Sequence, residues 1–246
     1  MPESKVDVPD AICYTLNAMN KLYGLIFDVD GVIADTEAVN ARVSIKIFAD
    51  LFGIKGVRRE DFEAGIGRGA QEYVRAAART HGMELTDEKV EHATQLRQEY
   101  FLDILSKEPL PPFPGVLELM EEAMQREDFR VAIATSGTLE KSSAVLKAAK
   151  VPFKQMVYIN GSDVKNKKPD PELFLLAAAG LAINPADCVV IEDAPSGIQA
   201  AKAAGAKCIA VTNSADADKL READLICDSL EQMDIETIQK IIDKPI

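Results

Sequence analysis

Several features are scarce in this chain of 246 residues, and each scarcity excludes a class of protein. The four cysteines, at positions 13, 188, 208 and 227, have no C-x-x-C or C-x-x-H spacing, so we expect neither a zinc site nor a disulfide framework. We expect Cys188 and Cys208, which lie in apolar runs, to be buried thiols. His81 and His92 also lack metal-ligand spacing, and we expect both on the surface.

Long apolar runs and runs of basic residues are missing as well. No apolar run approaches the roughly 20 residues of a membrane-spanning helix. The net charge of −12 repels nucleic-acid phosphates and anionic membranes, so we expect neither as a partner. The first residues lack the features of a secretory signal, which favours a cytoplasmic protein, and residues 1–20 are expected to form an N-terminal arm.

The first informative feature of the sequence is an apolar run that ends in two acidic residues. The run from Tyr23 to Phe27 is followed by Asp28, Asp30 and Gly31. This pattern predicts a buried strand that delivers carboxylates to the edge of a sheet. Gly31 would then let the chain turn without a Cβ penalty.

The next segment has helical periodicity only. We expect helices from Thr36 to about Leu51, over 69–80 and over 86–105, and a proline cluster follows at 109–114. Residues 38–108 are therefore predicted to form a helical cap inserted into a core domain made of 21–37 and 109–246. Asp35 and Thr36 would form one hinge of this cap.

Beyond the prolines, helical and apolar segments alternate. The predicted helices are 116–125, 138–149, 171–181, 196–204 and 230–242, and the predicted strands are 129–135, 154–159, 188–193, 207–212 and 224–227. Continuous apolar strands that alternate with helices are typical of a parallel sheet covered on both faces. We therefore predict an α/β fold with a doubly wound parallel sheet.

Most of the predicted strands end in polar groups, which would meet at one edge of the sheet. Taken singly, each of these groups is explained as a helix cap or a turn residue. Taken together, they place several carboxylates near one point, which requires a hard divalent cation such as Mg²⁺. A hydroxyl, backbone amides and an ammonium group in the same place would bind a phosphoryl group. The groups are Asp28 and Asp30, Thr135-Ser136-Gly137, Lys168, and Glu192-Asp193.

Four motifs in this order resemble those of the haloacid dehalogenase-like hydrolases, in the branch that contains β-phosphoglucomutase and small sugar-phosphate phosphatases. They cover the chain from about Tyr23 to Thr212. The motifs are D-x-D-G-V-x-x-D-T at 28–36, Thr135, Lys168-Pro169-Asp-Pro171, and Glu192-Asp193 through Gly205.

The resemblance implies a role for each acid. Asp28 would be the nucleophile that forms an aspartyl-phosphate, and Asp30 would protonate the leaving alcohol and later deprotonate water. Mg²⁺ would be held by the Asp28 carboxylate, the Asp30 main-chain carbonyl and Asp193, with Glu192 assisting. An acid at Asp30 favours phosphoryl transfer over dehalogenation, because carbon–halogen cleavage needs no protonated leaving oxygen.

The resemblance also implies the phosphate- and substrate-binding groups. Thr135 and Lys168 would bind the transferring phosphoryl group, together with Ser136 and Gly137. In the cap, Gly65-Ile-Gly67-Arg68 looks like a substrate loop whose arginine reaches a second anionic group, although a solvated arginine in a helix–helix turn explains it equally well.

Two further cap positions bear on the substrate. Asn40 stands where similar mutases tend to have histidine, which weakens a mutase interpretation and makes Asn40 a candidate substrate contact. Arg97 could face the cleft, but a solvated helix face is favoured.

The sequence thus predicts a Mg²⁺-dependent phosphatase for a small phosphorylated metabolite, such as a sugar phosphate. A sugar phosphomutase is the first alternative, and a non-catalytic binding protein that retains the fold is the second. A monomer and a weak homodimer are both compatible with the sequence.

Overall fold

The computed structural model of the chain describes residues 21–65 and 69–244. Its centre is a six-stranded parallel sheet with the strand order β3-β2-β1-β4-β5-β6. The strands are β1 (Tyr23–Phe27), β2 (Phe129–Ala134), β3 (Val157–Ile159), β4 (Cys188–Glu192), β5 (Lys207–Val211) and β6 (Leu225–Cys227). The first strand in the chain therefore lies in the middle of the sheet.

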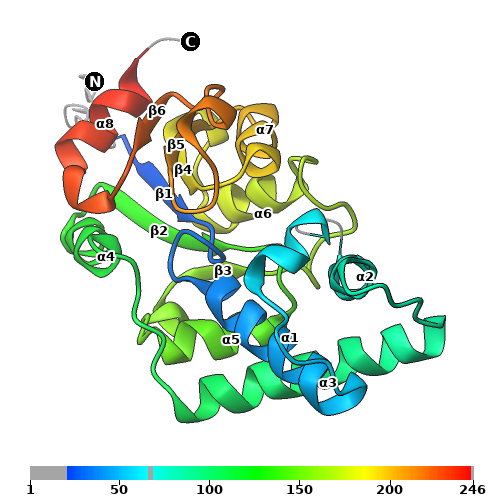
Figure 1. Cartoon of the computed structure of the whole chain (residues 1–246). Coiled ribbons are helices and arrows are strands. Elements are labelled where there is room, and N and C mark those ends of the chain that lie inside the picture. The colour runs from blue at the N-terminus through cyan, green and yellow to red at the C-terminus, as the bar shows by residue number, and fades with distance from the viewer. Residues whose placement is uncertain (1–20, 66–68, 245–246) are drawn as a thin grey trace, which may run out of the picture.

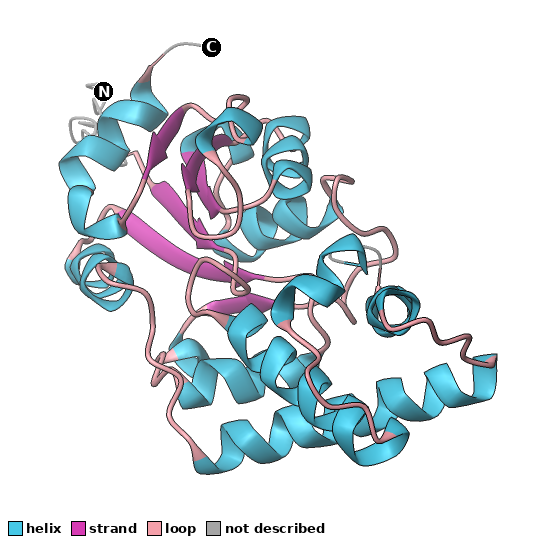
Figure 2. Ribbon diagram, viewed as in Figure 1, coloured by secondary structure: helices cyan, strands magenta, loops and turns pink. Residues whose placement is uncertain are grey.

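Both faces of the sheet are covered by helices, as Figure 2 shows. Side chains alternate between the faces of a strand, and Leu25 and Phe27 belong to one buried apolar cluster while Ile26 belongs to the other. The α-helices of the described residues are α1 (Thr36–Phe52), α2 (Ala70–Thr80), α3 (Asp87–Lys107), α4 (Val116–Gln125), α5 (Leu139–Ala148), α6 (Glu172–Leu181), α7 (Pro195–Ala203) and α8 (Ile235–Asp243). The predicted α/β fold with a doubly wound parallel sheet is confirmed.

In the described residues between β1 and α4, all regular structure is helical, apart from isolated bridges. Helices α1, α2 and α3 gather at the lower right of Figure 1, beyond the carboxyl ends of the strands. The chain enters and leaves this segment at adjacent points, because Ala34 forms a bridge with Pro112 and the Phe113 amide donates to the Ile33 carbonyl at 2.8 Å. The division of the chain into cap and core remains a prediction.

Two predicted elements are shorter in the structure. The strand expected over 154–159 forms only at Val157–Ile159, because Phe153–Gln155 make a 3-10 turn, η2, directly after Pro152. The helix expected over 230–242 begins at Ile235, where the Asp234 side chain accepts from the Thr237 amide and caps the helix.

Burial confirms one sequence-based expectation and corrects another. Cys188 and Cys208 are fully buried, as expected. His81 is not a solvated surface residue: Nε2 lies 2.8 Å from Asp61 Oδ2, and the imidazole is only 24% exposed. Within the described ranges, no helix is long and apolar enough to cross a membrane.

Candidate active site

Strands β1, β2 and β4 end side by side and carry the predicted site residues. The register pairs Phe27 of β1 with Ile133 of β2 and Ile191 of β4. The next residues along these strands emerge at the same edge of the sheet, and they include Asp28 and Glu192. A parallel sheet thus brings together positions separated by more than a hundred residues in the chain.

Lys168 lies between two buried carboxylates. Its Nζ is 2.5 Å from Asp28 Oδ1 and 2.5 Å from Glu192 Oε1. Burial alone would lower the pKa of Lys168, but the charges of Asp28 and Glu192 and the hydrogen bonds to them outweigh it and raise that pKa. The ammonium group therefore stays protonated beside the Asp28 carboxylate.

Glu192 is almost fully buried, and each of its oxygens has a partner. Oε1 accepts from Lys168, and Oε2 accepts from the amides of Asp193 at 2.9 Å and Ala194 at 3.1 Å. The carboxylate packs against Gly197 of α7, where an added Cβ would lie 1.8 Å from Oε1. These contacts hold Glu192 as an anchor for Lys168. Its predicted help in metal binding stays a prediction.

Asp193 follows Glu192 and packs against the turn after β1. A Cβ at Gly31, whose φ is +78°, would lie 1.8 Å from Asp193 Oδ2, so only glycine permits this approach. Burial, together with the charge of Glu192, raises the pKa of Asp193 to about 7. Burial also raises the pKa of Asp28, against the opposing charge of Lys168.

This arrangement fits a divalent cation held by few protein ligands. Over the described ranges, no three His, Cys, Asp or Glu side chains are placed to hold a metal ion by themselves. The predicted ligands are two carboxylates, Asp28 and Asp193, and the Asp30 carbonyl. All three donors are oxygens, as Mg²⁺ prefers, and a cation would offset the cost of two buried carboxylates.

Asp30 differs from Asp28 because its side chain is 39% exposed. The Thr36 hydroxyl donates to its Oδ1 at 2.5 Å, and Lys141 Nζ lies 3.8 Å from the same oxygen. Thr36 is the first residue of α1, and the preceding Asp35 caps that helix by accepting from the Ala38 amide. The two residues predicted as a hinge thus orient Asp30 and start the helix.

The loop after β2 carries the predicted phosphoryl-binding groups. Thr135 is fully buried, and its hydroxyl accepts from the Gly137 amide at 3.0 Å. An added Cβ on Gly137 would lie 3.7 Å from Asp30 Oδ2, which puts this loop beside the acid. Ser136 is exposed.

The predicted cap contacts have different outcomes. Arg68 lies outside the described residues. Asn40 of α1 is half-buried, and its Oδ1 accepts from an Arg97 terminal nitrogen at 3.1 Å. Arg97 is therefore not on a solvated face, as the sequence favoured: its guanidinium packs 4.5 Å from the centre of the Tyr73 ring, and its Nε is buried.

Sequence reasoning missed two contacts of Asp30. Lys141 carried no motif, and its only signal was its place in the first turn of the helix after Thr135. The sequence predicts Thr36 as part of a hinge, but Thr36 stands six residues after Asp30, near enough for a turn to bring them together.

Comparison with known proteins decides the family. The family model described as haloacid dehalogenase-like hydrolase matches residues 25–211. The chain belongs to this family. The predicted family and the prediction of a hydrolase of this type are thus confirmed, and the matched region contains every described site residue discussed above.

Three relatives of this haloacid dehalogenase-like hydrolase illustrate the range of the family. It is 32% identical over 213 residues to hexitol phosphatase A of Escherichia coli (strain K12), covering 86% of this chain and 93% of that protein. It is 34% identical over 205 residues to the Arabidopsis thaliana protein SUPPRESSOR OF QUENCHING 1, chloroplastic, covering 82% of this chain but only 19% of that protein. The structure of CbbY from Rhodobacter sphaeroides in complex with xylulose-(1,5)bisphosphate is similar with a TM-score of 0.71 and 27% identity, covering 85% of this chain and 95% of that one.

Proposed function

We propose that this chain is a Mg²⁺-dependent phosphatase that hydrolyses a small phosphorylated metabolite, in the class of sugar phosphates, through an aspartyl-phosphate. The observation that carries the proposal is the buried Asp28 carboxylate held 2.5 Å from Lys168 at the carboxyl edge of the sheet. Relatives named as phosphatases, such as hexitol phosphatase A, support the same reaction class.

The first step is attack of an Asp28 oxygen on the phosphorus atom. The new bond joins this oxygen to phosphorus, and the bond between phosphorus and the alcohol oxygen breaks. Asp30 donates its proton to that departing oxygen, so the alcohol leaves neutral. The Asp30 side chain is partly exposed, which lets it reach the departing oxygen.

The second step returns the enzyme to its starting state. Asp30, now a carboxylate, accepts a proton from water as the water oxygen attacks phosphorus. The bond between phosphorus and Asp28 breaks, which releases inorganic phosphate and restores the Asp28 carboxylate. The Thr36 hydroxyl holds Asp30 in place through both transfers.

Positive charge and donors around the phosphoryl group lower the barrier for both steps. Lys168 donates to the nucleophilic carboxylate and is fixed by Glu192. Bound Mg²⁺, held by Asp28, Asp193 and the Asp30 carbonyl, would supply further positive charge next to the phosphoryl oxygens. The loop at Thr135 would bind the same oxygens.

Hydrolysis is favoured over phosphoryl return to a sugar. In a mutase, the phosphoryl group goes back to a hydroxyl of the substrate instead of to water. Asn40 occupies the position where similar mutases tend to carry histidine, and its amide is engaged with Arg97. Isomerised product without free phosphate would contradict the phosphatase assignment.

The test measures phosphate release from a panel of sugar phosphates, with Mg²⁺ and after treatment with a chelator. We expect Asp28→Asn to reduce release by at least about a thousandfold, because the variant lacks the nucleophile. Asp218→Asn is the matched control, since its side chain is 81% exposed and forms an ion pair with the exposed Arg221. Persistent release in the Asp28 variant, or in the absence of any divalent cation, would overturn the proposal.

A further inference from the structure

The loop made of Thr135, Ser136 and Gly137 is held by the chain that ends and follows β3. The Thr135 amide donates to the Ile159 carbonyl at 3.0 Å, and the Gly161 amide donates to the Gly137 carbonyl at 2.8 Å. These two hydrogen bonds hold the loop at its first and last residue. The backbone that is predicted to meet the phosphoryl oxygens therefore rests on a second backbone segment.

Gly161 can approach the loop closely because it has no side chain. A Cβ on Gly161 would lie 2.3 Å from the Ser136 carbonyl oxygen, 2.9 Å from the Ser136 carbonyl carbon and 3.1 Å from the Gly137 carbonyl oxygen. All three atoms belong to the backbone of the loop, so no flexible side chain can move aside. Because a carbon and a neighbouring oxygen stay about 3.3 Å or more apart, a methyl group here would displace the loop by about 1 Å.

The turn that contains Gly161 is fixed by the side chains of Asn160 and Asp163. Asp163 Oδ2 accepts from the Asn160 main-chain amide at 2.9 Å and from Asn160 Nδ2 at 2.6 Å. Asn160 is buried, and its Oδ1 accepts from the Ser162 amide at 3.0 Å. Both ends of the Asn160 side chain are thus used inside the turn, which fixes the position of Gly161.

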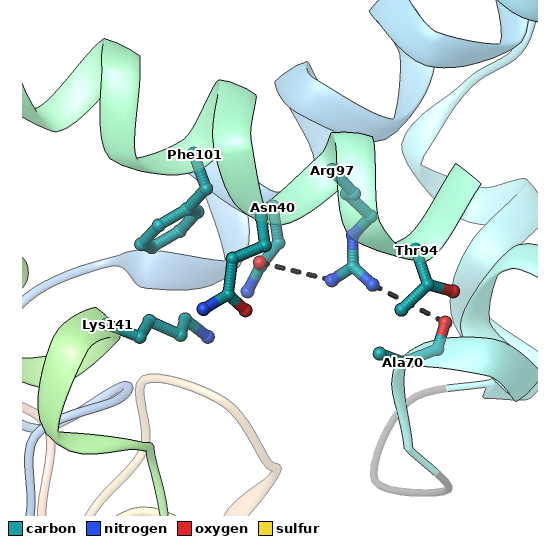
Figure 3. A pocket seen from close by; sticks show the side chains of 7 residues that line it. Asn40, Ala70, Thr94, Arg97, Phe101 and Lys141 are labelled. Carbon is teal, nitrogen blue, oxygen red and sulfur yellow. Dashed lines mark hydrogen bonds between the residues drawn. The ribbon is translucent and has the colours of Figure 1, made fainter. Parts of the chain in front are cut away.

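Strand β3 also contacts the first turns of α5, the helix that follows the loop. Ser142 Oγ donates to the Thr138 carbonyl at 2.6 Å, and the Tyr158 hydroxyl of β3 lies 2.5 Å from the same Oγ. Figure 3 shows Lys141 extending from this part of α5, and its Nζ lies 3.8 Å from Asp30 Oδ1. The β3 segment therefore supports the loop and the surroundings of Asp30 together.

We propose that the turn at residues 160–163 positions the phosphoryl-binding loop, with Gly161 and Asp163 as positioning residues. The inference rests on the proposed function, in which the loop binds the phosphoryl oxygens. Gly161 determines where the loop lies, and Asp163 holds Gly161 in place, so both act through the loop and not on the substrate. Donors stabilise a transferring group only at the correct distance, and a displacement of about 1 Å costs about a hundredfold in rate.

The test compares two glycine-to-alanine variants next to β3. Gly161→Ala places its methyl group against the loop, whereas Gly180→Ala, in the last turn of α6, places one 2.6 Å from the Val157 side chain at the start of β3. We expect Gly161→Ala to lower kcat/KM for para-nitrophenyl phosphate about a hundredfold and to weaken inhibition by inorganic phosphate about tenfold. Gly180→Ala should change neither quantity by more than about twofold at temperatures where it is folded.

Asp163 provides a second test that does not depend on the folding of Gly161→Ala. Asp163→Ala removes the acceptor that fixes the turn and should lower kcat/KM about tenfold, whereas Asp163→Asn keeps an acceptor oxygen and should retain at least about a third of the wild-type value. The Gly161 amide, followed by NMR without substrate, should exchange its hydrogen about tenfold faster in Asp163→Ala than in the wild type.

Three results would overturn the inference. The first is a folded Gly161→Ala variant that keeps the wild-type kcat/KM and phosphate inhibition, the second is an equal loss of activity in folded Gly180→Ala, and the third is unchanged exchange at Gly161 in Asp163→Ala. A wild type that hydrolyses no ester, para-nitrophenyl phosphate included, would refute the proposed function instead. The exchange measurement would then still decide whether Asp163 holds Gly161 against the loop.

Discussion

Replacing Gly197 by alanine adds one methyl group next to Glu192 and tests whether Glu192 anchors Lys168. It lies in the first turn of α7, and a Cβ there would be 1.8 Å from Glu192 Oε1 and 1.9 Å from Cδ. The Glu192 carboxylate cannot move freely, because it accepts from two amides and from Lys168. We therefore expect Gly197→Ala to destabilise the fold and to disturb the anchoring of Lys168.

One stabilising and two destabilising contributions determine the change in the free energy of unfolding. In an open helix position, replacing glycine by alanine stabilises by about 1 kcal/mol. Overpacking a buried site costs roughly 1–3 kcal/mol, and a weakened hydrogen bond to a charged group costs about 1.5–3 kcal/mol. The net expectation is a loss of about 3 kcal/mol, which corresponds to a melting temperature roughly 6–12 °C lower for a chain of this size. We expect kcat/KM for phosphate release to fall by about tenfold.

The assay combines thermal melting with phosphate release for the wild type, Gly197→Ala and a control. Gln199→Ala serves as the control because Gln199 is exposed on the same helix, and its change should stay within about 0.5 kcal/mol. A Gly197→Ala variant that melts at or above the wild-type temperature and retains full activity would show that Glu192 needs no space at Gly197. The role of Glu192 as the anchor of Lys168 would then be refuted.

Two further predictions concern hydrogen bonds made by single side chains. Thr36→Val removes the hydroxyl that donates to Asp30 and should lower kcat for phosphate release about tenfold or more. Thr36→Ser keeps a hydroxyl and should retain most of the activity. Equal kcat values for the wild type and both variants would show that Thr36 does not orient Asp30. The Arg58 amide and His81 lower the pKa of Asp61 below its ordinary value of 3.8, so Asp61 contributes stability that is present above about pH 4 and is lost as the pH falls. Urea unfolding should show Asp61→Asn about 1 kcal/mol less stable than the wild type at pH 7, and this difference should shrink as the pH falls below about 4. A difference that stays constant as the pH falls would contradict this.

The fold and the core of the site followed from local sequence patterns. An apolar run that ends in acids is a strong signal for a parallel strand whose carboxyl end carries those acids. The pairing of β1 with β4 then brings Asp28 close to Glu192. In a parallel sheet all strands run in the same direction, so their carboxyl ends lie at one edge whatever the order of the strands. Helix boundaries were close because caps such as Asp35 and Gly53 stand at the ends of the apolar periodicity.

The contacts that escaped prediction are those between helices far apart in the chain. Arg97 lies on a helix with a weak apolar stripe, and nothing in its neighbours indicates that Tyr73 and Asn40 cover it. His81 follows the end of α2 and meets Asp61, twenty residues earlier in the 3-10 helix Arg59–Gly65, and no motif marks this pair. Such pairs depend on how the helices pack, which local periodicity leaves undetermined.

The central place of β1 in the sheet has a consequence for biosynthesis. A ribosome releases β1 first, yet its two neighbours begin only at Phe129 and Cys188. Until β4, which begins at Cys188, has been made, one edge of β1 has no strand to pair with, and unpaired edges favour association with other chains. Asp28, at the end of that strand, likewise meets Lys168 and Glu192 only late in synthesis, so the nascent protein stays inactive until its second half has folded.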